Sequence, residues 1–387
     1  MAQTVLIACD SSKSLMDFRG NLVELIAQQH KVHVYTSGIM HPSFREKLKL
    51  MQVKVHEIEL KGGVVSVFLD LMYMIQLYKL MKNIKPDVFF PYTLKPVIYG
   101  TLLAKICQIK SITPMLTGLG YNFTSASKNK LVSHITRRLL KFSLTESKRL
   151  KIIFHNNDDY QTLLQCNILT EKHQAVIVNG SGVDLDYYTY CEPNTKKINF
   201  LMIARLINAK GIREYYEAAK NIRLRFPEVT FNLIGTYGDN VDVIDDELYT
   251  KICSGDVVNY RGEVGDVRPY IQNASVIVLP SYREGMPRSL LEGMAMGRAI
   301  ITCDAVGCRE TINSEGEVNG LLVPVKNVPE LVAKMEFFIN NTDAIYHYGI
   351  NGLAFVRKKF DVHMINAEML NIMHLDKEYA DLNEITN

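Results

Sequence analysis

The sequence predicts an α/β protein with two doubly wound, mostly parallel sheets. Short apolar runs alternate with amphipathic helical stretches along the whole chain, which is the pattern of β-α-β units. The alternation restarts after a polar segment near Thr195–Lys197, and 387 residues exceed what one hydrophobic core usually covers. We therefore expect an N-terminal domain at 1–190 and a second domain from 191 onward, with a cleft between them.

In the first half, strands are expected where β-branched and aromatic residues gather: Thr4–Cys9, Val32–Thr36, Val53–Leu60, Val88–Pro91, Ile112–Leu116 and Ile152–His155. Helical patterns separate them, most clearly at Phe18–Gln29, Val65–Ile84 and Ile98–Cys107. A last short strand, Ala175–Asn179, leads to a Gly-Ser-Gly turn.

In the second half, strands are expected at Ile198–Ala204, Val229–Ile234, Val257–Tyr260, Val276–Leu279 and Ala299–Cys303. Helices are expected at Gly211–Arg225 and Ser289–Met296, and helical stretches follow from about Pro329 to Ile339 and Thr342 to Lys359. In open sheets of this type, ligands bind beyond the carboxyl ends of the strands.

The composition is that of a globular protein outside the nucleic-acid and membrane-spanning classes. Hydrophobic residues make up 47% and charged residues 22%, and 44 Lys+Arg against 41 Asp+Glu is only mildly basic. The seven Cys show no C-x-x-C spacing, so we expect reduced thiols and a cytoplasmic protein. We recognise no signal peptide and no membrane span, so we expect a surface position if the protein works on a membrane.

Arg205 and Lys210 follow one apolar run and open a helix. A guanidinium offers two parallel donors to a phosphate, and an ammonium adds a compact charge. The pair is suited to a leaving diphosphate, although a single Arg-x₄-Lys is also common among exposed cations.

A second segment follows another apolar run. Glu284 is followed by Gly285, Met286 and Pro287, which favour a tight turn with amides facing a ligand. Ser289 is expected to cap the next helix, whose N-terminus attracts phosphate. Glu292, one turn later, can accept two hydroxyl hydrogen bonds from a ribose, or it simply favours the helix dipole. Together the two segments predict a sugar-nucleotide site.

These segments resemble the GT4 family of retaining glycosyltransferases, which carries an Arg-x₄-Lys pair and an E-x₇-E motif. The resemblance continues at Gly182-Val183-Asp184, at Gly307-x-x-Glu310 and at Asn319–Val323, and covers most of residues 175–330. The sequences of the segments Leu201–Arg205 and Val278–Tyr282 resemble those of bacterial enzymes that add N-acetylgalactosamine to undecaprenyl-diphosphate-linked sugars. The first domain matches that subgroup more loosely, through Phe18-Arg19 and Gly118-Leu119-Gly120.

The resemblance implies a GT-B fold of two Rossmann-like domains, with a donor domain at 191–360 and a segment at 361–387 that packs back on the acceptor-binding first domain. It implies a UDP-sugar co-substrate and a lipid-linked sugar acceptor, as in O-antigen assembly. Arg205, Lys210 and Glu284 would serve catalysis. With Gly285, Met286, Pro287, Ser289, Glu292 and Val264 they would bind the donor, and Arg19, Gly118 and Tyr121 would lie on the acceptor side.

The first domain departs from the family pattern. Many members have a Gly-Gly loop after the first strand, where this chain has Asp10-Ser11-Ser12-Lys13. Many also have a His facing the donor sugar, where the matching segment here is Thr117–Asn122. We therefore assign no catalytic role to a first-domain residue.

No cofactor and no metal are expected. Asp184-Leu185-Asp186 matches a D-x-D metal motif, but it follows a Gly turn and favours an ordinary turn segment. The ten His show no zinc-like pairing.

Lys128–Lys151 concentrates eight cations against one acid, with apolar residues at helical spacing. Such a helix either lies on an anionic leaflet, through Arg137, Arg138 and Lys141, or is a solvated scaffold helix. The first option places the protein peripherally on the inner face of the cell membrane. Nucleic acid is disfavoured because aromatic residues are sparse there.

Three other functions remain open. A UDP-sugar 2-epimerase shares the fold but needs carboxylates around C2 of the sugar. A Rossmann dehydrogenase should show G-x-G-x-x-G after the first strand, which this chain lacks. A non-catalytic sugar-nucleotide or lipid-binding module would not need the complete set of charged residues.

Overall fold

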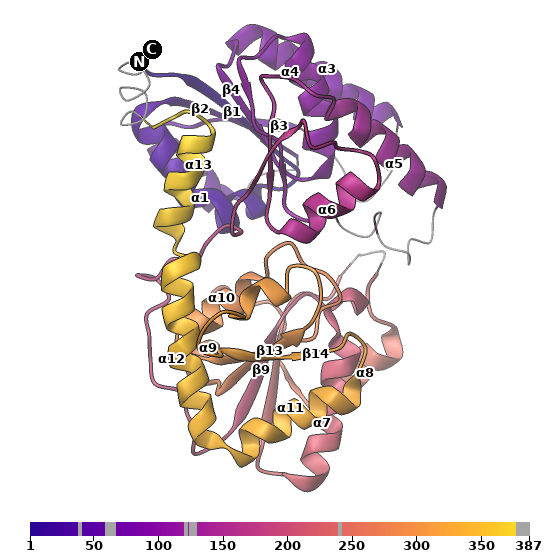
Figure 1. The fold of residues 1–387 in the computed structure, drawn as a ribbon, viewed down its shortest axis with the longest axis vertical. Helices are drawn as coiled ribbons and strands as arrows, with labels where there is room; N and C mark the ends of the chain where they lie inside the picture. Colours follow the sequence, from indigo (N-terminus) through magenta and orange to yellow (C-terminus); the bar gives the residue numbers. More distant parts are fainter. Residues whose placement is uncertain (38–40, 59–66, 120–122, 124–129, 239–241, 377–387) are drawn as a thin grey trace. The chain divides into compact units, whose positions relative to one another are not determined.

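The computed structural model describes residues 1–37, 41–58, 67–119, 123, 130–238 and 242–376. The chain divides into two compact units (Figure 1). The first combines Met1–Ser181 with Met364–Asn387, and the second is Gly182–His363. Each is a parallel α/β unit.

The first unit contains a five-stranded parallel sheet in the order β3-β2-β1-β4-β5. Its strands are β1 (Thr4–Cys9), β2 (Lys31–Ser37), β3 (Lys54–Ile58), β4 (Val88–Pro91) and β5 (Ser111–Ile112). A second sheet has the order β6-β7-β8, with β6 (Met115–Leu116), β7 (Lys151–Phe154) and β8 (Gln174–Ile177).

The single strand expected at Ile112–Leu116 is wrong. The structure ends β5 at Ile112 and begins β6 at Met115, and the two belong to different sheets. Pro114 lies between them and has no amide proton to continue a ladder. The apolar run therefore serves two sheets in succession.

The helices of the first unit are α1 (Ser12–Gln29), α2 (Pro42–Leu50), α3 (Val67–Ile84), α4 (Thr101–Ile106), α5 (Lys130–Ser143) and α6 (Asn157–Gln165). A π-helix at Pro96–Gly100 directly precedes α4. Helix α1 begins earlier than the expected Phe18 because the Ser11 hydroxyl accepts a hydrogen bond from the Ser14 amide and caps it.

Helix α13 (Val362–Ile372) carries the chain from the second unit into the first. Ile365, Met369 and Met373 are buried in the same core as Val5 and Ile7 of β1. A hydrogen bond of 3.0 Å from His30 Nε2 to the Leu375 carbonyl fixes the end of this segment. The segment after α12 thus completes a core that begins with β1.

The second unit contains a six-stranded parallel sheet in the order β11-β10-β9-β12-β13-β14. Its strands are β9 (Asn199–Ile203), β10 (Thr230–Ile234), β11 (Asn259–Tyr260), β12 (Val276–Leu279), β13 (Ala299–Cys303) and β14 (Gly320–Val323). Its helices are α7 (Ile212–Arg225), α8 (Asp246–Cys253), α9 (Arg268–Asn273), α10 (Arg288–Ala295), α11 (Val328–Asn340) and α12 (Thr342–Lys359).

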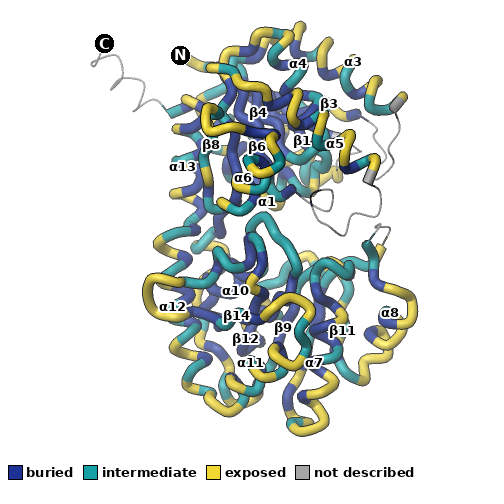
Figure 2. The backbone as a smooth tube through the Cα atoms, turned by 45° about the vertical axis from the view of Figure 1, so that its right-hand side comes forward, coloured by how far each residue is buried: buried dark blue, intermediate teal, exposed yellow. Residues whose placement is uncertain are grey.

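Every residue of β12 and β13 is buried (Figure 2), which explains why both read as continuous apolar runs. In each main sheet the strand order reverses between two neighbouring strands, β1 and β4 in the first unit and β9 and β12 in the second. Ligands of doubly wound proteins bind beyond the carboxyl ends of such strands. The two switch points therefore direct attention to the loops after β1, β4, β9 and β12.

Across the described ranges, no helix combines the length and apolar character that crossing a bilayer requires.

Candidate functional site

The loop after β9 lies against the loop after β12. Lys210 ends a short 3₁₀ turn, and Gly211 follows it with φ of 73°. A Cβ on Gly211 would lie 2.1 Å from the carbonyl oxygen of Pro280, so only glycine permits this approach. The close approach brings the two predicted motifs together at the switch point.

Hydrogen bonds fix the two loops to each other. The Tyr282 amide and the Ser281 hydroxyl both donate to the Ala209 carbonyl, at 2.8 and 3.0 Å. The Ala209 amide in turn donates to the Asp242 carboxylate at 2.8 Å. The backbone on both sides of Lys210 is thereby held in place.

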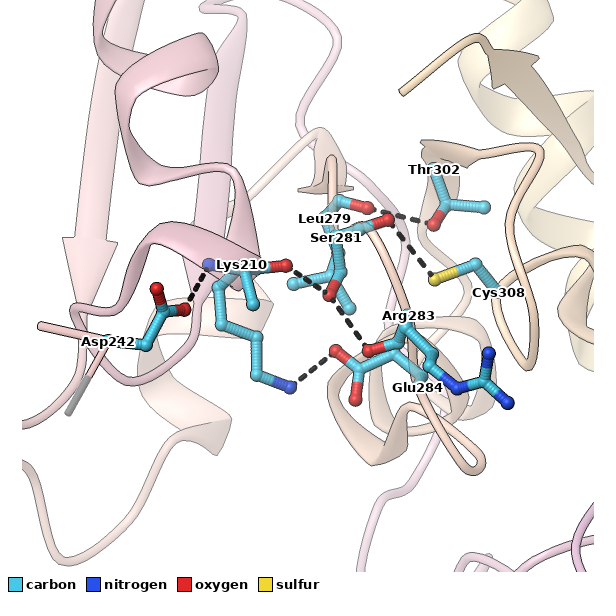
Figure 3. Close-up of polar contacts among 9 residues, drawn as sticks. Lys210, Asp242, Leu279, Ser281, Arg283, Glu284, Thr302 and Cys308 are labelled. Atoms are coloured by element: carbon cyan, nitrogen blue, oxygen red, sulfur yellow. Dashed lines mark hydrogen bonds and ion pairs between the residues drawn. The ribbon is translucent and has the colours of Figure 1, made fainter. Parts of the chain in front are cut away.

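The Lys210 ammonium donates to the Glu284 carboxylate, and the two side chains point toward one another (Figure 3). The pair is largely enclosed, because the exposed fractions of the side chains are 18% and 12%. Glu284 itself is fixed by its amide, which donates to the Val306 carbonyl at 2.9 Å. This ion pair joins the first motif directly to the second.

A third loop, after β13, supports the Glu284 turn. Gly307 has φ of 75°, and a Cβ there would lie 2.3 Å from the Glu284 carbonyl oxygen. The loop at Gly307 therefore packs directly against the Glu284 turn, whereas Glu310 forms an ion pair with Lys359 on α12. Gly285 and Met286 remain half-buried in the turn, and Pro287 is buried.

Helix α10 begins at Arg288, with Pro287 as its N-cap and no side-chain capping bond. The expectation that Ser289 caps this helix is therefore wrong, because Ser289 lies inside the first turn. Pro287 supplies the turn geometry instead of a hydroxyl cap. Ser289 is half-buried and lies in the first turn of α10, but it does not cap the helix. Its role in binding the donor stays a prediction.

Glu292 is only 8% exposed on α10. Its carboxylate lies 3.0 Å from the Arg288 guanidinium, one helical turn earlier. It also accepts a hydrogen bond from the Tyr188 hydroxyl, whose pKa is raised first by burial and then by the Glu292 charge. Sequence reasoning missed both partners, although the Arg288–Glu292 spacing was visible and Tyr188 carried no local signal.

Arg205 follows β9 and is exposed. Within the described ranges, no carboxylate pairs with its guanidinium, which leaves that charge available to an anion. Val264, in the loop after β11, is half-buried and packs against the core of the second unit. The predicted donor residues thus come from the loops after β9, β11 and β12 and from α10.

In the first unit, Arg19 is only 2% exposed. Its guanidinium lies 3.1 Å from Met115 Sδ and 2.8 Å from His155 Nε2. Burial, helped by the Arg19 charge, holds the pKa of His155 well below its usual value, so His155 is a neutral acceptor. Gly118 is half-buried, and Tyr121 lies outside the described residues. Their role toward an acceptor stays a prediction.

On α5, Arg138 and Lys141 are exposed, whereas Arg137 is half-buried with its guanidinium 5.2 Å from the Phe123 ring centre. Of the three predicted membrane residues, Arg138 and Lys141 therefore present an exposed charge, whereas the Arg137 charge lies over an aromatic ring.

Asp184 accepts hydrogen bonds from the amides of Asp186 and Tyr187, at 3.0 and 2.9 Å. This is an Asx-type turn, as the sequence favoured. Among the residues placed by the structure, no group of three or more His, Cys, Asp or Glu is arranged to hold a metal ion.

Two family models match the chain. Residues 10–156 match the model described as glycosyl transferase 4-like, and residues 197–341 match glycosyl transferases group 1. The second of these ranges contains Arg205, Lys210, Val264, Glu284 and Glu292.

The chain belongs to the GT4-like, group 1 glycosyltransferases.

The glycosyltransferase is 26% identical to the N,N'-diacetylbacillosaminyl-diphospho-undecaprenol alpha-1,3-N-acetylgalactosaminyltransferase of Campylobacter jejuni, over 85% of this chain and 87% of that one. It is 24% identical to the UDP-Gal:alpha-D-GlcNAc-diphosphoundecaprenol alpha-1,3-galactosyltransferase of Escherichia coli, over 69% and 70%.

Among solved structures, HepE of Anabaena in complex with UDP and glucose superimposes with a TM-score of 0.74 at 16% identity, covering 95% of this chain and 98% of that one. The fold of the glycosyltransferase is GT-B, as the resemblance implied.

Proposed function

We propose that the glycosyltransferase moves a hexosamine, in the first instance N-acetylgalactosamine, from a UDP-sugar to a sugar carried on a lipid diphosphate. The ion pair between Lys210 and Glu284 at the switch point of the second unit carries this proposal. It brings a phosphate-binding cation and a sugar-binding carboxylate together. The two relatives, both named as acting on undecaprenol-linked diphosphate sugars, support the acceptor class. We further propose a role in the assembly of surface polysaccharide such as O-antigen.

The site residues can perform this transfer without a protein nucleophile. Arg205 and Lys210 would hold the diphosphate and stabilise the charge that grows on it as the bond to the sugar breaks. Glu284 and the Gly285–Pro287 turn would then contact the donor sugar and the β-phosphate. Glu292, held by Arg288 and Tyr188, would accept hydrogen bonds from the ribose hydroxyls.

We propose retention of the anomeric configuration. The departing phosphate oxygen takes the proton of the acceptor hydroxyl on the face where that hydroxyl attacks. The oxygen of the acceptor then bonds to the anomeric carbon as the bond to the phosphate breaks. Orientation and charge stabilisation are the protein's contributions.

We also propose that transfer needs no metal ion, because the two cations occupy the role of a divalent ion. We expect activity to persist in excess EDTA, measured as product formed from a UDP-sugar. Loss of activity that Mn²⁺ or Mg²⁺ restores would contradict this and return attention to Asp184 and Asp186.

Access to a lipid-linked acceptor would be provided by the surface of the first unit. Helix α5 exposes Leu131, Ile135 and Phe142 beside the cations Arg138 and Lys141. Helix α3 exposes a second apolar row, Phe68, Leu71, Met72 and Ile75. Apolar side chains bordered by cations suit the headgroup region of an anionic leaflet, and a peripheral position on the inner face of the membrane follows.

The test is a panel of UDP-sugars offered with a short-chain lipid diphosphate N-acetylhexosamine. We expect one UDP-N-acetylhexosamine to give a disaccharide product whose anomeric coupling, read by NMR, is α. A β-linkage would overturn retention. Formation of a C2-epimerised UDP-sugar in the absence of acceptor would show that the enzyme is an epimerase and not a transferase.

A further inference from the structure

A second polar centre lies in the first unit, at the carboxyl ends of β1 and β4. Asp10 follows β1 directly, and Thr93 and Lys95 follow β4. Asp70 and Tyr73 reach this point from α3, and Tyr99 reaches it from the π-helix. This is the switch point of the five-stranded sheet, and none of these residues belongs to the donor site in the second unit.

The charges of the centre are arranged in a definite way. The Lys95 ammonium lies 2.9 Å from one Asp70 oxygen, and the Tyr99 hydroxyl donates to the other at 2.8 Å. Asp70 is therefore satisfied by fixed donors. Asp10 lies close enough to Thr93, Lys95 and Asp70 that all three affect its ionisation.

The Tyr73 hydroxyl of the centre is buried. Tyr73 is 1% exposed, and its hydroxyl has no hydrogen-bond partner among the residues that the structure describes. The charges of Asp10 and Asp70 both raise its pKa, after the larger effect of burial, so the hydroxyl lies near both carboxyl groups. A buried, unpartnered hydroxyl costs free energy, and an incoming hydroxyl would satisfy it.

The backbone around the centre is unusual as well. Thr93 is β-branched yet has φ of 71°, a conformation that such residues rarely adopt. The π-helix follows immediately, and π-helical turns occur frequently at functional sites. Both features lie between Tyr92 and Gly100, where the chain leaves β4.

The chemistry of the centre favours an uncharged, hydroxyl-rich ligand. Two carboxyl groups are present for one ammonium, and that ammonium is already paired with Asp70, so a phosphate would meet net repulsion. Carboxylates and phenol hydroxyls suit the donors and acceptors of a sugar ring. Asp10, Thr93 and Lys95 are partly exposed, so a ring could reach the centre from solvent.

We propose that Asp10 and Tyr73 bind the sugar ring of the acceptor through its hydroxyl groups. This rests on the transferase function proposed above, and it gives a role to the Asp10–Lys13 loop that replaces the family's Gly-Gly. The Asp10 carboxylate accepts a hydrogen bond from one ring hydroxyl, and the Tyr73 hydroxyl pairs with another. Asp70, held by Lys95 and Tyr99, is a positioning residue.

Tyr73→Phe is the sharpest variant, because it removes a hydroxyl that has no partner among the described residues and should leave the fold intact. We expect it to raise the KM for the short-chain lipid diphosphate N-acetylhexosamine about 3- to 10-fold. Asp10→Asn should raise that KM about 10- to 100-fold. Both variants should keep the KM for the UDP-sugar. Tyr78→Phe, on the exposed part of the same helix, is the control and should leave both constants unchanged.

Binding is also measured without catalysis, so that a failure of the transferase function is distinguished from a failure of this site. Saturation-transfer NMR with free N-acetylglucosamine, N-acetylgalactosamine and galactose, each with saturating UDP, should show contact in the wild type and loss in both variants. Equal signals in all three proteins, or no signal in the wild type, would overturn the proposal. If the variants instead raised the KM for the UDP-sugar, Asp10 and Tyr73 would bind the donor sugar. That result would overturn the assignment of this site to the acceptor.

Discussion

At the scale of single residues, Lys210 and Arg205 differ in their surroundings although they belong to one motif. Lys210 is enclosed and paired with Glu284, whereas Arg205 is exposed. A diphosphate would therefore compete with Glu284 for Lys210, while Arg205 has no carboxylate partner to lose among the residues that the structure describes. Charge on the enclosed cation is worth more because less water screens it.

We expect Lys210→Ala and Arg205→Ala each to lower kcat/KM by about 10²- to 10³-fold, a loss of about 2–4 kcal/mol of transition-state stabilisation. Steady-state kinetics with the preferred UDP-sugar measures this, and the melting temperature reports whether the fold survives. Lys220→Ala, an exposed cation on α7, is the matched control. Near-normal kcat/KM in both site variants would remove the proposed donor site.

The ionised carboxylate of Asp10 lowers the free energy of unfolding of the first unit, because burial disfavours its charge. Burial raises the pKa of Asp10 from 3.8 to about 6, so the folded protein holds a proton between about pH 4 and 6 that the unfolded chain releases. The group therefore costs stability that is absent below pH 4, grows as the pH rises to 6, and is complete above it. Such a cost is typical of binding residues.

We expect Asp10→Asn to raise the free energy of unfolding of the first unit at pH 7, by roughly 2–3 kcal/mol for a shift of this size. The gain should shrink toward zero as the pH falls from 6 to 4. Hydrogen exchange of the β1 amides, followed at several pH values in both proteins, measures it. A gain independent of pH would mean that Asp10 is not the titrating group.

At the scale of elements, α5 presents cations and apolar side chains to solvent on one helix. Arg138 and Lys141 are the exposed cations, whereas Arg137 is engaged with Phe123. The double variant Arg138→Glu with Lys141→Glu therefore tests the membrane surface more cleanly than a triple variant that includes Arg137.

We expect that double variant to leave anionic vesicles at physiological salt, since each cation near such a surface contributes about 1 kcal/mol. Vesicle sedimentation measures the binding. Transfer to a long-chain acceptor should slow more than transfer to a short, soluble one. Lys172→Glu with Lys196→Glu carries the same change of charge on exposed sites elsewhere and should stay bound. Release of both variants alike would mean that net charge alone is responsible.

The sequence predicted the elements whose apolar runs are unbroken. β1, β4, β12 and β13 have the expected bounds. Element boundaries set by proline were harder to predict. Pro114 divides one apolar run between two sheets, and Pro287 is the N-cap of α10, where Ser289 was expected.

The site was foreseen as a pattern of charges around a ligand. The contacts that hold it depend on residues far apart in sequence. Tyr188 at Glu292, Asp242 at Ala209 and Asp10 beside Asp70 have no local spacing to reveal them.

At the scale of the whole molecule, the first unit is discontinuous and the second is an uninterrupted segment. Met369 of α13 is fully buried in the core that contains β1, whereas Met364 of the same helix is 49% exposed. The stability of the first unit should therefore depend on a helix that the chain reaches only after completing the second.

We expect Met369→Ala to destabilise the first unit by about 2–5 kcal/mol, the usual cost of a buried Met-to-Ala change. UDP binding in the second unit, measured by calorimetry, should stay unchanged. Hydrogen exchange of the β1 amides reports the first unit, and Met364→Ala should be nearly neutral. Equal loss of protection in both units would show that they unfold as one.

The late return of the chain through α13 has a consequence for synthesis on the ribosome. The first unit begins at β1, but its core lacks Ile365, Met369 and Met373 until translation has passed the entire second unit. At about 5–20 residues per second, the gap between β8 and α13 lasts roughly 10–40 s. During that interval the apolar side chains of β1 and α1 that will pack against α13 stay uncovered. We expect the nascent chain to depend most on chaperones at this stage.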